Sequence, residues 1–177
     1  MSDSLSDYFL SLLAFSPISR LRRNHGLEHA TLHVLQQRNP QRSMAGHSDL
    51  SGFWIIGDIE TEEIQSATAE ALRRLRSGEH SLAIHPNCGT NIVTAAVLAG
   101  SVSALSMFGA GRRFRDKLER LPLAITLATL ALIAAQPLGY LLQERLTTSG
   151  EPDALEIVEI IPTQRGRFKV YRIVTVG

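Results

Sequence analysis

Cysteine is almost absent from this 177-residue chain, and the single residue, Cys88, excludes an intramolecular disulfide framework. The lone thiol is therefore a metal ligand, a reactive group or a small core side chain. A charge excess of one sign is also lacking, because 18 basic and 17 acidic residues give a net charge of +1. Aromatic residues are scarce at 6% and are not interleaved with basic ones. We therefore expect no nucleic-acid partner.

Two long stretches contain no charged residue at all. They cover residues 86–111 and 121–143, and a basic connector of about ten residues joins them. Apolar spans of about 20 residues are long enough to cross a bilayer, so the pattern predicts a transmembrane helical hairpin over residues 91–146. A helical hairpin buried in a soluble protein is the alternative. A shorter apolar run, residues 8–19, predicts either an interfacial helix or a helix packed in the core.

Histidine is concentrated in residues 24–33. In a helix, His25 and His29 lie one turn apart, and Glu28 projects from an adjoining part of the same face. Two such imidazoles can hold one metal ion, and a carboxylate beside them can take a proton from bound water. The pattern His-x-x-Glu-His is that of inverted zinc peptidases, although so short a pattern also occurs by chance. Those enzymes use a downstream helical glutamate as third ligand, which makes Glu70 and Glu79 candidates.

A second stretch with metal-binding side chains lies at residues 85–91. It contains His85 and, three residues later, Cys88, directly before the first apolar span. With His25 and His29 these two residues would complete a tetrahedral shell for Zn²⁺, although another transition metal would suit some subsets of the donors. A position near a helix N-terminus would favour the thiolate form of Cys88 that a metal requires.

The two motifs together, His-Gly-x-Glu-His at residues 25–29 and His-Pro-x-Cys-Gly-Thr at residues 85–90, resemble the YqhQ-like family of predicted metal-dependent bacterial membrane proteins. They are more similar still to a smaller uncharacterised bacterial family that shares both motifs. The resemblance covers mainly residues 24–34 and 84–92. It implies a metal site but no particular reaction, and His33 and His47 lie outside the shared pattern. The matching residues are His25, Glu28, His29, His85 and Cys88.

Local signals predict the elements that carry these motifs. Ser16 and Pro17 indicate the start of a helix that ends near Arg38, before Asn39-Pro40. We expect a loop over residues 41–52, a strand over 53–59, and a helix capped by Thr61. A second strand is expected over 81–85, and a β-hairpin over 155–161 and 168–176.

The predicted fold class is α+β. It combines a small mixed β-sheet and two or three packed helices with the transmembrane hairpin. The sheet is expected to be mixed because the strand–helix–strand order favours a parallel or split pairing. The predicted regions are a metal-motif region (1–90), the hairpin (91–146) and a C-terminal β-hairpin that completes the sheet (147–177).

Two functions follow from these expectations. The first is a membrane-associated zinc-dependent hydrolase of inverted-zincin type, with Glu28 as catalytic base and a protein or peptide as substrate. The second is a non-enzymatic, metal-stabilised scaffold or assembly module with a closed His/Cys site. A redox role for Cys88 is disfavoured because the chain offers no resolving cysteine.

The expected location is the bacterial inner membrane, with membrane lipid as a partner. The basic residues around the spans give opposing indications of orientation. Residues 1–90 lack an export signal, which favours soluble parts in the cytoplasm.

Overall fold

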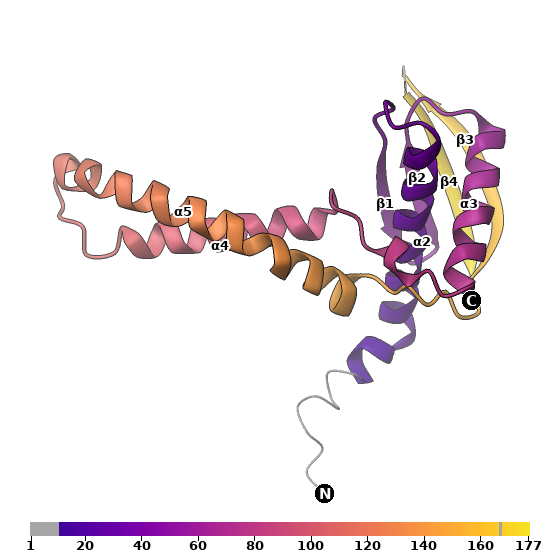
Figure 1. The fold of residues 1–177 in the computed structure, drawn as a ribbon, viewed down its shortest axis with the longest axis horizontal. Helices are drawn as coiled ribbons and strands as arrows, with labels where there is room; N and C mark the ends of the chain where they lie inside the picture. The colour runs from indigo at the N-terminus through magenta and orange to yellow at the C-terminus, as the bar shows by residue number, and fades with distance from the viewer. Residues whose placement is uncertain (1–10, 167) are drawn as a thin grey trace, which may run out of the picture. The chain divides into compact units, whose positions relative to one another are not determined.

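The computed structural model describes residues 11–166 and 168–177, which form two compact units. The first unit contains the chain up to residue 85 together with residues 144–177, and the second contains residues 86–143 (Figure 1). Part of the helix expected over residues 8–19 lies outside the described residues. Within its described part, Leu12 and Phe15 are exposed, so these two side chains are not packed in a core.

The first unit is built on one four-stranded sheet. Its strands are β1 (Ala45–Asp49), β2 (Gly52–Ile56), β3 (Glu156–Arg165) and β4 (Phe168–Val176), arranged in the order β1-β2-β4-β3. The C-terminal hairpin joins strands from the first half of the chain, because β4 pairs with β2. Every pairing is antiparallel, so the prediction of a mixed sheet is wrong. The α+β class is confirmed.

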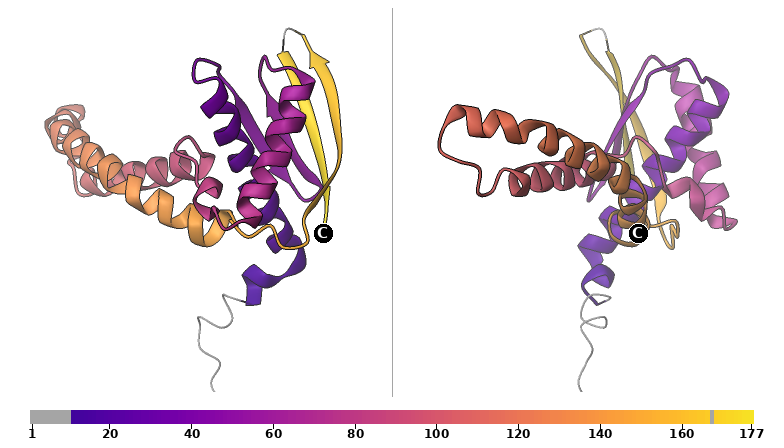
Figure 2. Two further views of the ribbon diagram at one scale, coloured as in Figure 1. Left: turned by 45° about the vertical axis from the view of Figure 1, so that its right-hand side comes forward. Right: turned by 60° about the vertical axis from the view of Figure 1, so that its left-hand side comes forward.

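Two helices pack on one face of this sheet, α2 (Ser16–Arg38) and α3 (Thr61–Arg76) (Figure 2). The core between them and the sheet is formed by alternate strand residues, such as Phe53 and Ile173, and by the apolar side of each helix. α2 begins and ends where its proline signals predict. Thr61 is the first residue of α3 rather than its cap, a position that Glu60 occupies in an extended conformation.

Two expectations about segments near the motifs are wrong. Residues 45–49 are not a loop but the edge strand β1, whose pairing with the apolar β2 compensates for a polar sequence of low strand preference. Residues 81–85 are not a strand. They contain most of a short 3₁₀ helix, η1 (His80–Ala83), because Leu82 and Ala83 are buried against the core instead of pairing with the sheet. The segment that carries His85 is therefore a connection, and the parallel crossover expected from it does not exist.

The second unit is a pair of long helices, α4 (Gly89–Ser106) and α5 (Phe114–Leu142), that pack along each other. Both are long and apolar enough to cross a membrane. At their contact Gly139 lies against Asn91, which accepts a hydrogen bond of 2.6 Å from the amide of Gln143. A short π-helix, η2 (Gln143–Thr147), follows α5.

Most apolar side chains of this helix pair are not buried. Seven large ones are 56–70% exposed, which is the opposite of a core hairpin in a soluble protein. They are Ile92, Val93, Val97, Leu105, Ile125, Leu130 and Ile133.

Candidate metal centre

Three histidines lie along one side of α2, because His25, His29 and His33 follow each other at intervals of four residues. The ring centroids of His25 and His29 are 4.3 Å apart. Nδ1 of His25 is 2.9 Å from the carbonyl oxygen of Thr147, and Nδ1 of His29 is 2.7 Å from that of Ala83. A carbonyl oxygen only accepts, so both Nδ1 atoms carry the proton. In the neutral form of both rings, Nε2 therefore holds the lone pair and can bind a metal ion.

Glu28 lies between these two histidines in the sequence and is only 4% exposed. Its carboxylate accepts a hydrogen bond from the hydroxyl of Ser48 on β1 and lies against Gly46, where a side chain would overlap with it. Burial raises the pKa of Glu28 above its usual value, while the Ser48 hydrogen bond and the charges of His25 and His47 act in the opposite direction. A buried carboxylate with a raised pKa is suited to accepting a proton near neutral pH.

Gly26 allows the close approach of the segment that orients His25. A Cβ atom at this position would overlap with the backbone carbonyl of Ser149, whose N–H donates a 2.9 Å hydrogen bond to the carbonyl of Arg22. The glycine thus lets residues 147–149 lie directly on α2, where the Thr147 carbonyl reaches the imidazole. This close contact explains a glycine that is otherwise costly inside a helix.

His85 follows η1 and is 7% exposed. Its ring centroid is 5.6 Å from that of His29 and 4.8 Å from that of His33. Burial, followed by the charges of His33 and His29, lowers the pKa of His85 to about 4. The ring is therefore neutral at pH 7, as a metal ligand must be. Nε2 of His33 is 2.8 Å from the carbonyl of Ile84, so the two rings are held by the same short segment.

His33, to which the motif comparison gave lower weight, lies beside His85. The signal that could have found it is the repeated spacing of four residues along α2, which places it on the same side as His25 and His29. His47 lies on β1, opposite Trp54 of β2.

The alternative acidic ligands take part in ion pairs with arginines. The carboxylate of Glu70 lies 2.6 Å from a nitrogen of Arg38, and Glu79 lies 2.6 Å from a nitrogen of Arg74. These pairs account for both glutamates without a metal ion.

Cys88 belongs to the second unit, where it caps α4 and its Sγ accepts a 3.4 Å hydrogen bond from the N–H of Thr90. It follows His85 by three residues, so chain length alone keeps their Cα atoms within about 11 Å. His25, His29 and Cys88 together supply nitrogen and sulfur donors that could hold a transition-metal ion.

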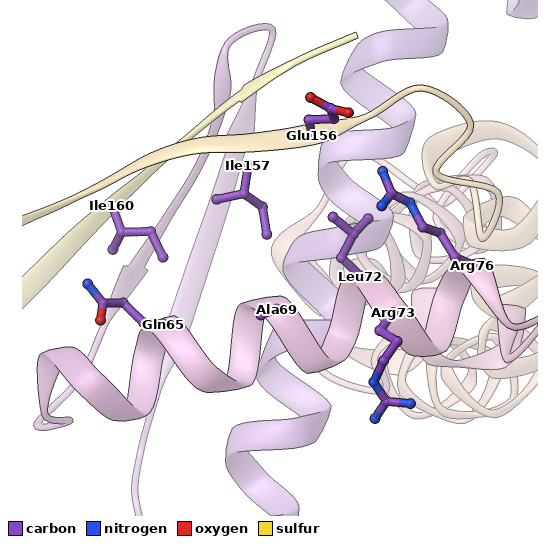
Figure 3. A pocket seen from close by; sticks show the side chains of 8 residues that line it. All are labelled: Gln65, Ala69, Leu72, Arg73, Arg76, Glu156, Ile157 and Ile160. Atoms are coloured by element: carbon purple, nitrogen blue, oxygen red, sulfur yellow. The ribbon is translucent and has the colours of Figure 1, made fainter.

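A cavity of about 500 Å³ lies in the first unit between α3 and β3 (Figure 3). Its floor is apolar, and at one end Arg76 donates a 2.9 Å hydrogen bond to the carbonyl of Leu155. No histidine lines it, so it is separate from the candidate metal centre. The lining residues are Gln65, Ala69, Leu72, Arg73, Arg76, Glu156, Ile157 and Ile160.

Comparison with known proteins places the chain in a family. A model of the domain of unknown function DUF6391 matches residues 20–160, and the chain belongs to this family. The matched range includes both histidine motifs and both apolar helices. The chain is also 36% identical over 139 residues to an uncharacterized protein of Picosynechococcus sp. strain PCC 7002. That match covers 73% of this chain and 66% of the relative, just under two thirds of its length. No solved structure matches the chain.

Proposed function

We propose that this protein is a membrane-associated, zinc-dependent hydrolase that acts, most simply, on peptide bonds. The observation that carries the proposal is the pair of hydrogen bonds from Nδ1 of His25 and His29 to backbone carbonyls. These hydrogen bonds leave the Nε2 atoms of two histidines on adjacent turns of α2 available as ligands. The buried Glu28 lies between the two histidines in the sequence. Oriented imidazoles of this kind are typical of metal-binding histidines.

The third ligand in this proposal is Cys88. His85 lies nearer to His33 than to His29, which makes it the weaker candidate. Cys88 comes three residues after His85, and its position at the start of α4 favours the thiolate. Three protein ligands leave one tetrahedral position open, as hydrolysis requires.

The roles of the groups in hydrolysis follow from their chemistry. A zinc ion held by His25, His29 and Cys88 would lower the pKa of a bound water molecule and polarise the carbonyl group of the substrate. Glu28 accepts a proton from the attacking water, whose oxygen bonds to the carbonyl carbon of the substrate. The same carboxyl group then donates that proton to the amine nitrogen as the carbon–nitrogen bond breaks. The elements of water are thereby added across the bond, and no other reactant is needed.

We place the protein in the bacterial inner membrane, with the first unit in the cytoplasm and α4 and α5 in contact with lipid. The exposure of most apolar side chains on these helices supports this location. The resemblance of the two motifs to the YqhQ-like membrane proteins is consistent with it.

A second candidate function is a metal-stabilised membrane module without catalysis. One observation favours it. The imidazoles of α2 hydrogen-bond to both segments that connect the first unit to the helix pair, at Ala83 before α4 and at Thr147 after α5. A metal ion bound to these imidazoles would hold α2 in the conformation that binds both connecting segments, and would thereby stabilise the folded protein.

The test is the zinc content and peptidase activity of full-length protein purified in detergent. His29→Asn keeps a donor at the position of Nδ1 and removes Nε2, so we expect it to lose one equivalent of zinc. His80→Asn is the matched control, because His80 is exposed and its Nδ1 also bonds to a carbonyl, that of Gly150, at 2.7 Å. Glu28→Gln should keep the zinc and lower turnover of a casein or peptide-library substrate by about 10²–10⁴-fold.

The outcomes separate the candidates. Zinc retained in His29→Asn as in the control would refute both metal functions. Zinc lost in His29→Asn, with no hydrolysis by the wild type and a lower melting temperature after metal removal, would favour the non-catalytic module. Zinc lost in Cys88→Ala as well would identify the thiol as a ligand.

A further inference from the structure

Four of the six imidazoles of the first unit occur as two pairs. The centroids of His25 and His29 are 4.3 Å apart, and those of His33 and His85 are 4.8 Å apart. The distance between the pairs, from His29 to His85, is longer at 5.6 Å. Two imidazoles bound to one tetrahedral zinc ion have centroids about 5 Å apart, given metal–nitrogen distances near 2 Å. The second pair therefore has the spacing of two ligands on one ion.

One ion cannot use all three histidines of α2. His25 and His33 are separated by eight residues, which corresponds to about 12 Å along a helix axis. Side chains anchored so far apart on a straight helix cannot both reach an ion at bonds of about 2 Å. A metal ion bound by His33 would therefore be a different ion from the one bound by His25.

Hydrogen bonds between α2 and the backbone that precedes His85 hold the second pair in place. The carbonyls of Ala83 and Ile84 accept from His29 and His33, respectively, and this fixes residues 83–84 against two turns of α2. His85 is the next residue and lies beside His33. Because Nε2 of His33 donates to Ile84, its Nδ1 holds the lone pair. The pair is thus oriented before any ion binds, which reduces the entropic cost of binding.

We propose that His33 and His85 form a second metal-binding position, next to that of His25 and His29. It takes Zn²⁺ or another divalent ion that prefers imidazole, such as Co²⁺, Ni²⁺ or Cu²⁺. With two protein ligands it is the weaker and more exchangeable of the two positions, and water fills the rest of its shell. His33 is only partly buried, so the position is open to solvent on one side.

The experiment is a zinc titration of the metal-free, full-length protein in detergent, by equilibrium dialysis. His33→Gln is the main variant, because its side-chain amide can still donate to the Ile84 carbonyl while the ring is removed. We expect two equivalents in the wild type and one in His33→Gln, His85→Gln and His29→Asn. The double variant with both His29→Asn and His33→Gln should bind none, and the control His80→Asn should bind two. Trp54 fluorescence verifies that each variant is folded. If His33→Gln does not fold, His85→Gln replaces it as the main variant.

Three results would overturn the proposal. They are a wild type that saturates at one equivalent, a His33→Gln variant that still binds two, and a loss of both ions in His33→Gln. A different result would refute the proposed hydrolase function while leaving the second metal-binding position intact. If His29→Asn binds two ions and His33→Gln binds one, the second position stands and the hydrolase site on His25 and His29 does not.

Discussion

The two units of the chain place their apolar side chains in opposite environments. In the first unit Phe53, Ile64 and Ile173 are completely buried between two helices and a sheet. In the second unit Ile125 and Ile133 belong to a well-packed helix pair but remain mostly exposed. Helix–helix contact alone therefore does not build a core there, because each helix is apolar on all sides rather than on one.

This difference favours lipid over water as the solvent of the second unit, as proposed above. Apolar surface left in water costs about 25 cal/mol per Å² relative to burial, so the second unit would be poorly stable and prone to aggregation in water. In a bilayer the same side chains contact lipid at no such cost. The histidines of the candidate metal centre lie in the unit that buries a core, and three of them are on its helix α2.

The largest expected difference between the units is in the free energy of unfolding, when an isoleucine is replaced by alanine in each unit. Ile64→Ala removes a fully buried side chain from α3 and should lower the free energy of unfolding by about 2–5 kcal/mol. Ile125→Ala, on α5 and 58% exposed, should change it little. Urea unfolding in detergent, followed by far-UV circular dichroism, measures both, because the single Trp54 lies in the first unit and reports on that unit alone. Equal losses would mean that the units are stabilised alike.

An arginine placed at equal exposure in each unit sharpens the contrast further. Ile133 on α5 and Val158 on β3 are 63% and 60% exposed. Ile133→Arg should impair membrane integration by about 3 kcal/mol, because a charge near the centre of a span must leave water. Val158→Arg should have no such effect. The measurement is the fraction of protein that stays in the membrane after alkaline extraction, and equal retention of both variants would contradict lipid contact at α5.

Features defined by local chemistry were predictable from the sequence. The limits of α2 follow from Pro17 and from Asn39-Pro40, which act on neighbouring backbone. The two apolar helices follow from the absence of charge over about 20 residues. The C-terminal hairpin follows from two β-branched runs. Each of these signals is contained within the element that it predicts.

Features that depend on distant partners were not predictable. β1 has no apolar alternation, and it becomes a strand only because β2 offers hydrogen bonds. Residues 81–85 alternate like a strand, yet burial of Leu82 and Ala83 against the core favours a 3₁₀ turn. For the candidate site, the motif identified His25 and His29. It could not reveal the proximity of His33 to His85, which depends on how residues 83–85 lie on α2.

The smallest effect expected is a pH dependence confined to the first unit, since residues 86–143 contain no histidine. Burial, followed by the charges of His33 and His29, lowers the pKa of His85 to about 4 in the fold, against about 6.5 in the unfolded chain. A folded-state pKa below the unfolded value means that stability is present above pH 6.5 and declines as the pH falls towards 4. For metal-free protein we expect His85 to contribute a loss of about 1.5 kcal/mol between pH 6.5 and pH 5. The raised pKa of Glu28 acts with the opposite sign, so the informative quantity is the difference between wild type and His85→Gln in urea unfolding followed by Trp54 fluorescence. The variant should lose less stability over this range, whereas identical slopes would show that His85 titrates normally in the fold.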